Sequence, residues 1–208
     1  AIKNGSYGKL MKAYYAKQDA EKLSGKGDTS QKLTLMKTSA DSLKKSADAL
    51  NDSSLWEKKK IKKKDEKTGE EIEVEDYDWD KITKAVKSFV EDYNDVVKEA
   101  GESNTKDVLR NASWMTGMTD KNSNMLAKIG ITIGKGNKLE LDEDALKQAD
   151  ISSLKTVFTG YNSFVSKISQ KATGISNAAN RASATYTNNG TYSKTDSSLT
   201  SSKIDKEV

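Results

Sequence analysis

The chain has 208 residues, a net charge of +4 at pH 7, and no proline, cysteine or histidine. Without cysteine and histidine there is no disulfide framework, no thiolate zinc site and no Ser-His-Asp or Cys-His nucleophile. The small basic excess is too weak to indicate nucleic-acid binding, and no apolar run reaches the ~20 residues that cross a bilayer. Because proline breaks helix interiors, its absence favours long, uninterrupted helices.

The first two predicted helices lie near the N-terminus. One covers residues 6–23, and a loop of glycine and aspartate at residues 24–28 ends it and offers a cap for the next helix. In the second helix an apolar residue recurs every three or four positions, which keeps one narrow stripe on a single face. The apolar residues are Tyr7, Leu10, Met11 and Tyr14 in the first helix, and Leu33, Met36, Ala40, Leu43, Ala47 and Leu50 in the second.

A charged insertion follows, and its pattern predicts a projecting β-hairpin. Residues 58–64 are basic apart from Ile61, and residues 70–76 are acidic apart from two apolar residues. Folding this segment back on itself sets Ile61 opposite Val74 on one face. The pairs predicted on the other face are Lys60 with Glu75, Lys62 with Glu73, and Lys64 with Glu71. Such pairs contribute only ~0.2–1 kcal/mol each, so they fix the pairing more than they stabilise it.

Two questions about this insertion stay open in the sequence. A turn with Gly69 at its fourth position shifts the predicted register by one residue. The basic run Lys58–Lys64 is either a patch for nucleic acid or another anionic surface, or a solvated strand neutralised by its own acidic partner. We favour the second interpretation, because the acidic run follows at once and no aromatic side chain interleaves the lysines as a stacking platform.

The third and fourth predicted helices come next. The third repeats the apolar spacing from Trp79 to Ala100, whereas the fourth, at about residues 105–128, is interrupted at Thr119 and Asn122. The stripe residues are Trp79, Ile82, Val86, Phe89, Tyr93, Val96 and Ala100 in the third helix, and Val108, Ala112, Met115, Leu126 and Ile129 in the fourth. Repetition of one period in separate segments predicts helices packed at the shallow angles of bundles and coiled coils.

A small hairpin is predicted after a left-handed helix stop at Gly130, with strands at residues 131–133 and 138–141 around a glycine-rich turn. Asp142 then caps a short helix that ends at about Ala149.

Residues 151–184 carry the longest heptad and predict one helix on the order of 50 Å long. Its stripe is Ile151, Leu154, Phe158, Tyr161, Val165, Ile168, Ala172, Ile175, Ala179 and Ala182, continuing to Tyr186. Gly160 and Gly174 fall inside it and each cost ~1 kcal/mol relative to alanine, so we expect any bend or break there. The stripes of the second and third helices are its expected partners within the chain.

Three motifs resemble ligand sites and fail as such. Residues 130–136 lack the spacing of a phosphate loop and place glycine where Ser or Thr is required. Residues 120–131 open like a calcium loop, but Met125 replaces the obligatory glycine and Ile131 the bidentate glutamate. The acidic residues Glu140, Asp142, Glu143 and Asp144 have the simpler role of capping a helix N-terminus.

No catalytic, cofactor-binding or metal-binding residue is predicted, so we expect the chain not to be an enzyme and to bind no cofactor. No pair of carboxylates is marked out for acid–base work among the 31 acidic residues. The three tryptophans, Trp56, Trp79 and Trp114, are interpreted as core anchors, since buried aromatic side chains dominate core energetics.

Between Phe89 and Tyr186, several short sequence motifs occur in an order that resembles a known family, the C-terminal region of the bacterial flagellar filament-capping protein, also called hook-associated protein 2. The motifs are Phe89-Val90-x-x-Tyr93-Asn94-x-Val96-Val97, Asp107-Val108-Leu109-Arg110, Leu126-x-x-Ile129-Gly130-Ile131-Thr132, Lys138-Leu139-Glu140-Leu141-Asp142-Glu143-x-x-Leu146 and Val157-Phe158-Thr159-Gly160. They cover a little under half of the chain.

The resemblance implies a structural assembly protein that is exported through the flagellar channel without a cleaved signal peptide. It implies an extracellular location at the flagellum or cell surface. Its expected partners are copies of itself and flagellin-like axial subunits, and in some bacteria a host or surface ligand. The family normally ends in another long coiled-coil helix and carries a large outer domain. Here the residues from Thr187 onward are a polar tail, and the outer domain is either missing or shrunk to the charged hairpin, so we expect a trimmed piece of an axial protein or a divergent relative.

The sequence therefore predicts a mainly α fold, an elongated antiparallel helical bundle or coiled coil with one or two small β-hairpins. Residues 1–56 and 77–186 form the bundle domain, residues 57–76 a charged hairpin insertion, and residues 187–208 a disordered polar tail. The predicted function is structural assembly through helix–helix self-association, with no small-molecule substrate and no membrane span. The alternatives are a surface adhesion module with a helical stalk and, less favoured, an intracellular binding protein that uses Lys58–Lys64.

Overall fold

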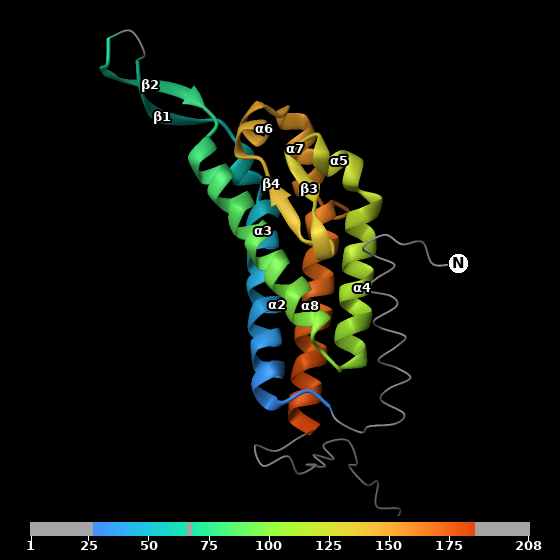
Figure 1. Cartoon of the computed structure of the whole chain (residues 1–208). Coiled ribbons are helices and arrows are strands. Elements are labelled where there is room, and N and C mark those ends of the chain that lie inside the picture. The colour runs from blue at the N-terminus through green and yellow to red at the C-terminus, as the bar shows by residue number, and fades with distance from the viewer. Residues whose placement is uncertain (1–26, 66–67, 186–208) are drawn as a thin grey trace, which may run out of the picture.

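A computed structural model describes residues 27–65 and 68–185. Over these residues the fold is mainly helical, with two small antiparallel β-hairpins, as the sequence predicts (Figure 1). The predicted helix at residues 6–23 and the predicted tail at residues 187–208 lie outside the described part of the chain, as does Tyr186. None of the helices described there has both the length and the apolar character needed to cross a membrane.

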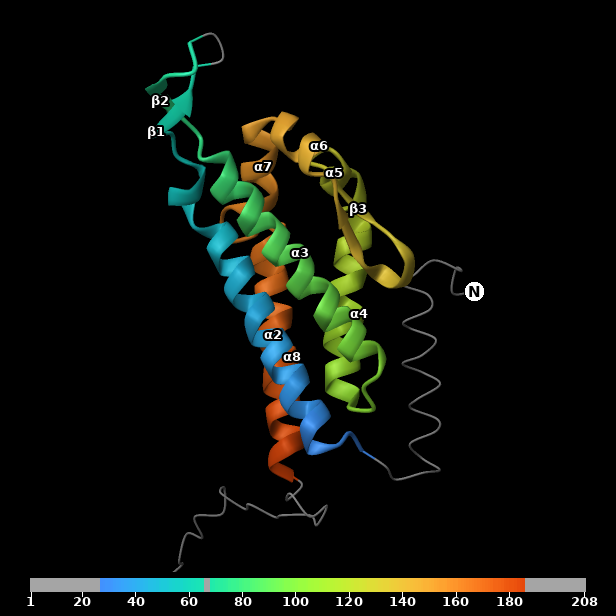
Figure 2. The same ribbon diagram turned by 60° about the vertical axis from the view of Figure 1, so that its left-hand side comes forward.

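Four long helices form the body of the molecule: α2 (Ser30–Asn51), α3 (Trp79–Gly101), α4 (Lys106–Lys121) and α8 (Phe164–Thr185). Successive long helices run in opposite directions, so α2 lies antiparallel to α3, α3 to α4, and α4 to α8 (Figures 1 and 2). The last helix, α8, also packs along the first, α2, and this is the most extensive contact between any two elements of the described residues. This is the up-down-up-down arrangement of a four-helix bundle.

The predicted apolar stripes meet inside this bundle. All six stripe residues of α2 are buried, and so is the α3 stripe apart from Trp79, which is half-buried. The stripe of α8 is buried from Val165 to Ala179. The three heptads therefore face one another within a single chain, and their apolar faces are core.

The helix that begins at Ser30 is capped differently from the prediction. Thr29 Oγ1 accepts a hydrogen bond from the Lys32 backbone N–H at 3.3 Å, so the cap of α2 is Thr29 and not the loop at residues 24–28. Asp28 is directed instead at the start of α4, 75 residues and more along the chain. The loop before α2 therefore contacts the turn that leads into α4 and does not cap α2.

The charged insertion forms the predicted hairpin. A short 3-10 helix, η1 (Ser53–Trp56), leads into β1 (Lys59–Lys64), which pairs with β2 (Glu71–Asp76). Ile61 lies opposite Val74, and the three predicted lysine–glutamate pairs have the predicted register. The hairpin projects beyond the end of the bundle where α2 ends and α3 begins (Figure 1).

The fourth predicted helix is interrupted. Helix α4 ends at Lys121, and a second short helix, α5 (Ser123–Ala127), follows directly. Asn122 makes the break: its side-chain Nδ2 donates to Met118 O at 2.8 Å, and its backbone N–H donates to the same carbonyl. Asn122 is one of the two residues at which the apolar stripe is interrupted in the sequence.

Gly130 is the predicted left-handed stop, with φ +80°. A Cβ there would lie 2.6 Å from the Asp142 carbonyl oxygen, so both the conformation and the close approach require glycine. The small hairpin follows as predicted, with β3 (Ile131–Ile133) paired to β4 (Leu139–Leu141) around η2 (Lys135–Asn137). Helix α6 (Glu143–Gln148) begins at the predicted cap, Asp142.

The prediction of one long helix over residues 151–184 is wrong. Helix α7 (Ile151–Phe158) ends before Gly160, which has φ +98°, and α8 starts at Phe164. Tyr161, a predicted stripe residue, lies in the intervening turn and is 83% exposed. The break occurs at one of the two glycines where it was expected, whereas α8 continues through Gly174. With 22 residues, α8 is ~33 Å long.

Candidate interaction surfaces

The motifs that resemble ligand sites have structural roles. Asp142 Oδ1 accepts hydrogen bonds from the backbone N–H groups of Asp144 and Ala145 at 3.0 and 2.9 Å, which is helix capping. Glu143 forms an ion pair with Lys87 at 3.3 Å. Within the described ranges, no group of three or more acidic side chains is placed to hold a metal ion.

The basic run lies along its acidic partner strand, in agreement with the interpretation of a solvated strand neutralised by that partner. Lys62 pairs with Glu71 at 3.7 Å, and Lys63 with Asp76 at 2.6 Å. At the base of the hairpin, Lys58 Nζ lies 5.7 Å from the centre of the Tyr77 ring. The lysines therefore alternate with carboxylates on a nearly neutral ribbon and do not form an uncompensated positive patch.

The three tryptophans differ in their surroundings. Trp56 is buried, stacks on Phe158 with ring centres 5.4 Å apart, and donates its indole N–H to Leu50 O at 2.8 Å. Trp79 is half-buried and packs against the core. Trp114 is 62% exposed, so its interpretation as a core anchor is wrong. Its position beside Met115 in the stripe already placed it off the apolar face of α4.

Trp114 lies in a groove between α4 and α8 with a volume of about 560 Å³. Met118 contributes to its apolar surface, and its rim carries Lys121, Lys167 and Lys171 against a single carboxylate, Asp120. Lys171 Nζ lies 5.4 Å from the centre of the Trp114 ring, a cation–π contact. Neither Lys121 nor Lys167 has an ion-pair partner in the described part of the chain. We call this surface the Trp114 groove.

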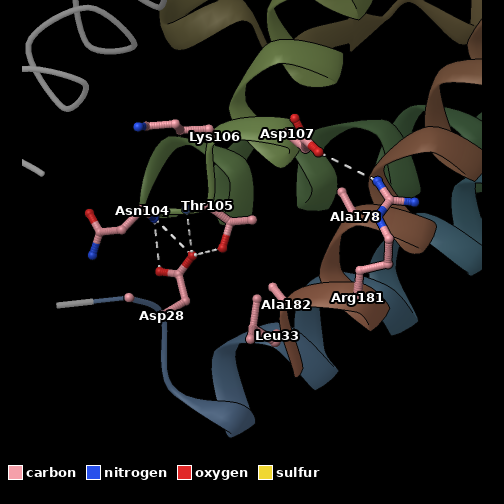
Figure 3. Close-up of a pocket in the computed structure, with 10 residues that line it drawn as sticks. Asp28, Leu33, Asn104, Thr105, Lys106, Asp107, Ala178, Arg181 and Ala182 are labelled. Carbon is pink, nitrogen blue, oxygen red and sulfur yellow. Dashed lines mark hydrogen bonds and ion pairs between the residues drawn. The ribbon is translucent and has the colours of Figure 1, made fainter. Parts of the chain in front are cut away.

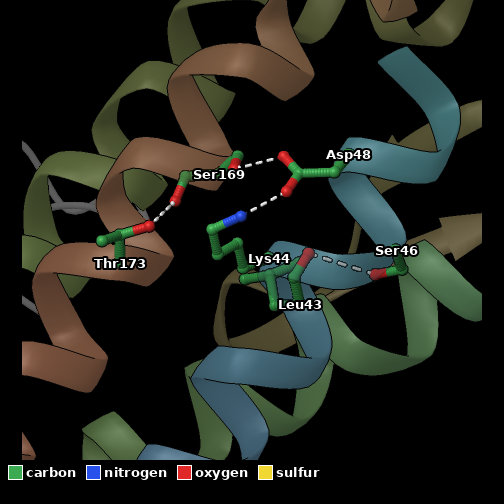
Figure 4. Close-up of polar contacts among 6 residues, drawn as sticks. All are labelled: Leu43, Lys44, Ser46, Asp48, Ser169 and Thr173. Atoms are coloured by element: carbon green, nitrogen blue, oxygen red, sulfur yellow. Dashed lines mark hydrogen bonds and ion pairs between the residues drawn. The ribbon is translucent and has the colours of Figure 1, made fainter. Parts of the chain in front are cut away.

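The opposite side of α8 is closed by a polar seam with α2. Ser169 Oγ donates to Asp48 at 2.6 Å (Figure 4). One heptad along the two helices, Ser176 Oγ donates to Asp41 at 2.6 Å. Lys44 forms an ion pair with Asp48 four residues along α2. Burial raises the pKa of Asp48, but hydrogen bonds from Lys44 and Ser169 and the lysine charge outweigh it and hold the pKa below its ordinary value. This seam fixes the register of the two helices.

A second hollow, of about 440 Å³, lies at the end of the bundle where α4 begins (Figure 3). Asp28 Oδ2 accepts hydrogen bonds from the backbone N–H groups of Asn104 and Thr105, both at 2.9 Å, and from the hydroxyls of Ser103 and Thr105 at 2.6 and 2.7 Å. Across the hollow, Arg181 pairs with Asp107 at 3.5 Å.

Asp28 therefore holds the turn that leads into α4, whose N-cap residue Thr105 makes no side-chain capping bond. Burial raises the pKa of Asp28, but the hydrogen bonds from Ser103, Thr105 and Asn104 outweigh it and lower the pKa below its ordinary value of 3.8. Sequence spacing had no means of finding this contact, because the donor and acceptor are separated by a whole helix pair.

Residues of the family motifs attach the small β3–β4 hairpin to the bundle. Asn94 on α3 donates from Nδ2 to Leu139 O at 2.9 Å and accepts from Leu139 N–H at 2.7 Å. The buried Tyr93 donates its hydroxyl hydrogen to Thr119 Oγ1 at 2.9 Å, which explains a polar residue in the α4 stripe.

Comparison with known proteins gives one family. The model of the flagellar hook-associated protein 2 C-terminus matches residues 103–207, just over half of the chain. The matched residues include both sides of the Trp114 groove and every family motif from Asp107 onward. The motif that begins at Phe89 lies before the matched region. No curated protein and no solved structure matches the chain. The chain belongs to the family of the flagellar hook-associated protein 2 C-terminus, whose members have a structural role at the extracellular flagellar cap.

Proposed function

We propose that this chain is a non-enzymatic component of a cap-type assembly, acting through self-association of its helical bundle and through contacts with flagellin-like axial subunits. Family membership supports the structural role. The single observation that supports the association is Trp114, a large aromatic residue that is 62% exposed beside a groove. Exposed aromatic anchors of this kind are enriched at protein–protein interfaces.

The contact surface follows from what the bundle already uses. The stripes of α2, α3 and α8 are buried within the chain, so they are not free for a second copy. Association through helices therefore uses the outer faces, and the Trp114 groove is a hollow in that outer surface, formed by the two long helices α4 and α8. In this proposal the helical bundle is the associating unit, and residues 57–76 are a separate hairpin inserted into it.

The nucleic-acid alternative is weaker. The lysines of β1 lie opposite the carboxylates of β2, which reduces the counterion release that drives phosphate binding. No comparable observation in the described residues favours a host ligand.

The test is the solution mass measured against protein concentration by sedimentation. We expect the mass to rise with concentration for the unchanged chain, and the Trp114→Ser variant to need at least about tenfold more protein for the same rise. The matched control is Leu35→Ser, which removes an apolar side chain that is 49% exposed on α2, away from the groove. Equal association by the two variants would remove the groove from the proposal, and a monomer at all concentrations would contradict self-association altogether.

A further inference from the structure

The charged hairpin is a two-stranded ribbon, so both of its strands are edge strands. It projects beyond the end of the bundle, and no third strand lies beside β1 or β2 in the described residues (Figures 1 and 2). A ribbon of two strands is only marginally stable in water, and further strands stabilise it. The backbone groups on its two outer edges are therefore the part of the hairpin that is still able to pair.

The register shows which backbone groups point outward. Asp65 N–H donates to Glu70 O at 2.8 Å, and these two residues continue the register of the ladder as a hydrogen-bonded pair. Hydrogen-bonded and non-hydrogen-bonded pairs alternate along an antiparallel ladder, and residues of the second kind direct their N–H and C=O groups away from the partner strand. The residues that direct these groups outward are Lys60, Lys62 and Lys64 on β1 and Glu71, Glu73 and Glu75 on β2.

The two outer edges have opposite charge. The outward-directed residues are all lysine on β1 and all glutamate on β2, and the side chains of all six are exposed. Within the ribbon, Lys62 and Glu71 form an ion pair at 3.7 Å. The side chains of this set without an ion-pair partner in the described part of the chain are Lys60, Lys64, Glu73 and Glu75.

Charge decides which edges are able to meet. Lysines on an edge strand oppose the addition of another basic strand, because like charges placed opposite one another are destabilising. Two copies that meet β1 against β1, or β2 against β2, are therefore disfavoured. When β2 meets β1 antiparallel, lysines lie opposite glutamates on one face of the sheet. Ile61 of one copy then lies on the same face as Ile72 and Val74 of the other.

We propose that the β2 edge of one copy pairs with the β1 edge of a second copy, antiparallel, to form a continuous four-stranded sheet. Two copies are required, because β1 and β2 of one chain already pair through their inner edges. Neighbouring strands rotate by about 20–25°, so a hairpin two strands along is turned by roughly 40–50°, which carries its bundle away from the first. The contact joins two different edges and is heterologous. It goes beyond the proposed association through the Trp114 groove and does not depend on it.

The absence of native cysteine makes the test direct. Glu73→Cys places one thiol in the middle of β2, and Lys62→Cys places another in the middle of β1. The two single variants of the full chain are mixed and treated with a short bismaleimide cross-linker. We expect covalent dimers in the mixture at about tenfold the yield from either variant alone. The matched control replaces Lys62→Cys by Lys45→Cys, at an exposed position of α2, and measures the yield from chance collisions.

The other outcomes overturn the inference. Cross-linking of Glu73→Cys alone would show β2 against β2, and cross-linking of Lys62→Cys alone would show β1 against β1. A yield from the mixture no higher than that of the Lys45→Cys control would remove the contact. The mixture is also measured in chains that carry Trp114→Ser, where we expect the same yield. A yield that falls to the control level there would mean that the groove brings the hairpins together, and would overturn an independent hairpin contact.

A charge exchange within the hairpin gives a second measurement. It is made in the Lys62→Cys chain and preserves the opposite charges across the hairpin's own two strands, while its β1 edge becomes acidic. Mixed with the Glu73→Cys chain, the exchanged chain should give about tenfold less cross-linked dimer than the Lys62→Cys chain. An unchanged yield would contradict pairing directed by charge. The exchanged residues are Lys60→Glu, Lys64→Glu, Glu71→Lys, Glu73→Lys and Glu75→Lys.

Discussion

Asp28 stands before α2 and binds the turn that precedes α4. Its carboxylate accepts hydrogen bonds from the backbone N–H groups of Asn104 and Thr105, which precede Lys106, the first residue of α4. The same bonds join the segment that enters the bundle to the turn between α3 and α4. One side chain therefore fixes both the start of a helix and the path of a distant segment.

Replacing Asp28 by asparagine should lower the free energy of unfolding by about 2 kcal/mol at pH 7. The pKa of Asp28 is lowered in the folded chain, so its stabilisation is present above the ordinary value of 3.8 and is lost as the pH falls through the folded pKa. Urea unfolding at pH 7 and below pH 3 measures this. Asp95→Asn, on an exposed position of α3, is the control and should change little. A difference for Asp28→Asn that does not shrink in acid would contradict the mechanism.

The tryptophans give a matched comparison of buried and exposed sites. Trp56→Ala should destabilise the fold by about 3–5 kcal/mol, because it opens a cavity against Phe158 and leaves Leu50 O without its donor. Trp114→Ala should change the free energy of unfolding by no more than about 0.5 kcal/mol. Thermal and urea unfolding at low protein concentration measure both. A large loss from Trp114→Ala would mean that this residue serves the fold and not an interface.

At the scale of elements, the break at Gly160 decides the shape of the C-terminal half. The left-handed conformation ends α7, and the Gly160 N–H donates to Asn51 Oδ1 at 2.8 Å at the end of α2. Ser163 Oγ then accepts from Ser166 N–H at 3.2 Å as α8 begins. The heptad continues across the break in the sequence, whereas the helix does not.

Gly160→Ala should cost about 1–2 kcal/mol, since an L side chain is strained at φ +98° although no atom lies within 4 Å of the added Cβ. Gly101→Ala is the matched control: it also has open space, but its φ is not in the left-handed region. We expect this control to be neutral or to stabilise the chain by up to about 1 kcal/mol. Equal effects in urea unfolding would show that the turn tolerates a side chain.

At the scale of the whole molecule, the bundle and the charged hairpin are separable. No residue of β1 or β2 belongs to the buried core, and α2 and α3 are antiparallel neighbours whose adjoining ends lie close together. The bundle therefore has the contacts that hold it without the hairpin.

Replacing residues 58–76 by a short glycine–serine linker should leave the helical circular dichroism of the bundle and its melting temperature within a few degrees of the unchanged chain. Loss of the helical signal would contradict the separability of the insertion.

The sequence by itself determined the elements with repeating patterns. The stripes of α2 and α3, the register of the charged hairpin and the stop at Gly130 all follow from local rules: side-chain period, charge alternation, and the conformations open to glycine. The family was also recognisable from short sequence motifs that occur in a fixed order. These features are local because each depends on residues a few positions apart.

Only the tertiary structure decided which helix each capping or polar residue serves and which faces remain exposed. Asp28 binds the turn before α4, Thr119 accepts a hydrogen bond from Tyr93, and the Trp114 side chain is exposed. The packing of helices that are distant in the sequence sets each of these surroundings. It also decided that the three heptads meet within one chain, which a period alone does not distinguish from contact between chains. The helical period fixes which residues share a face, and the packing of the four helices fixes what that face contacts.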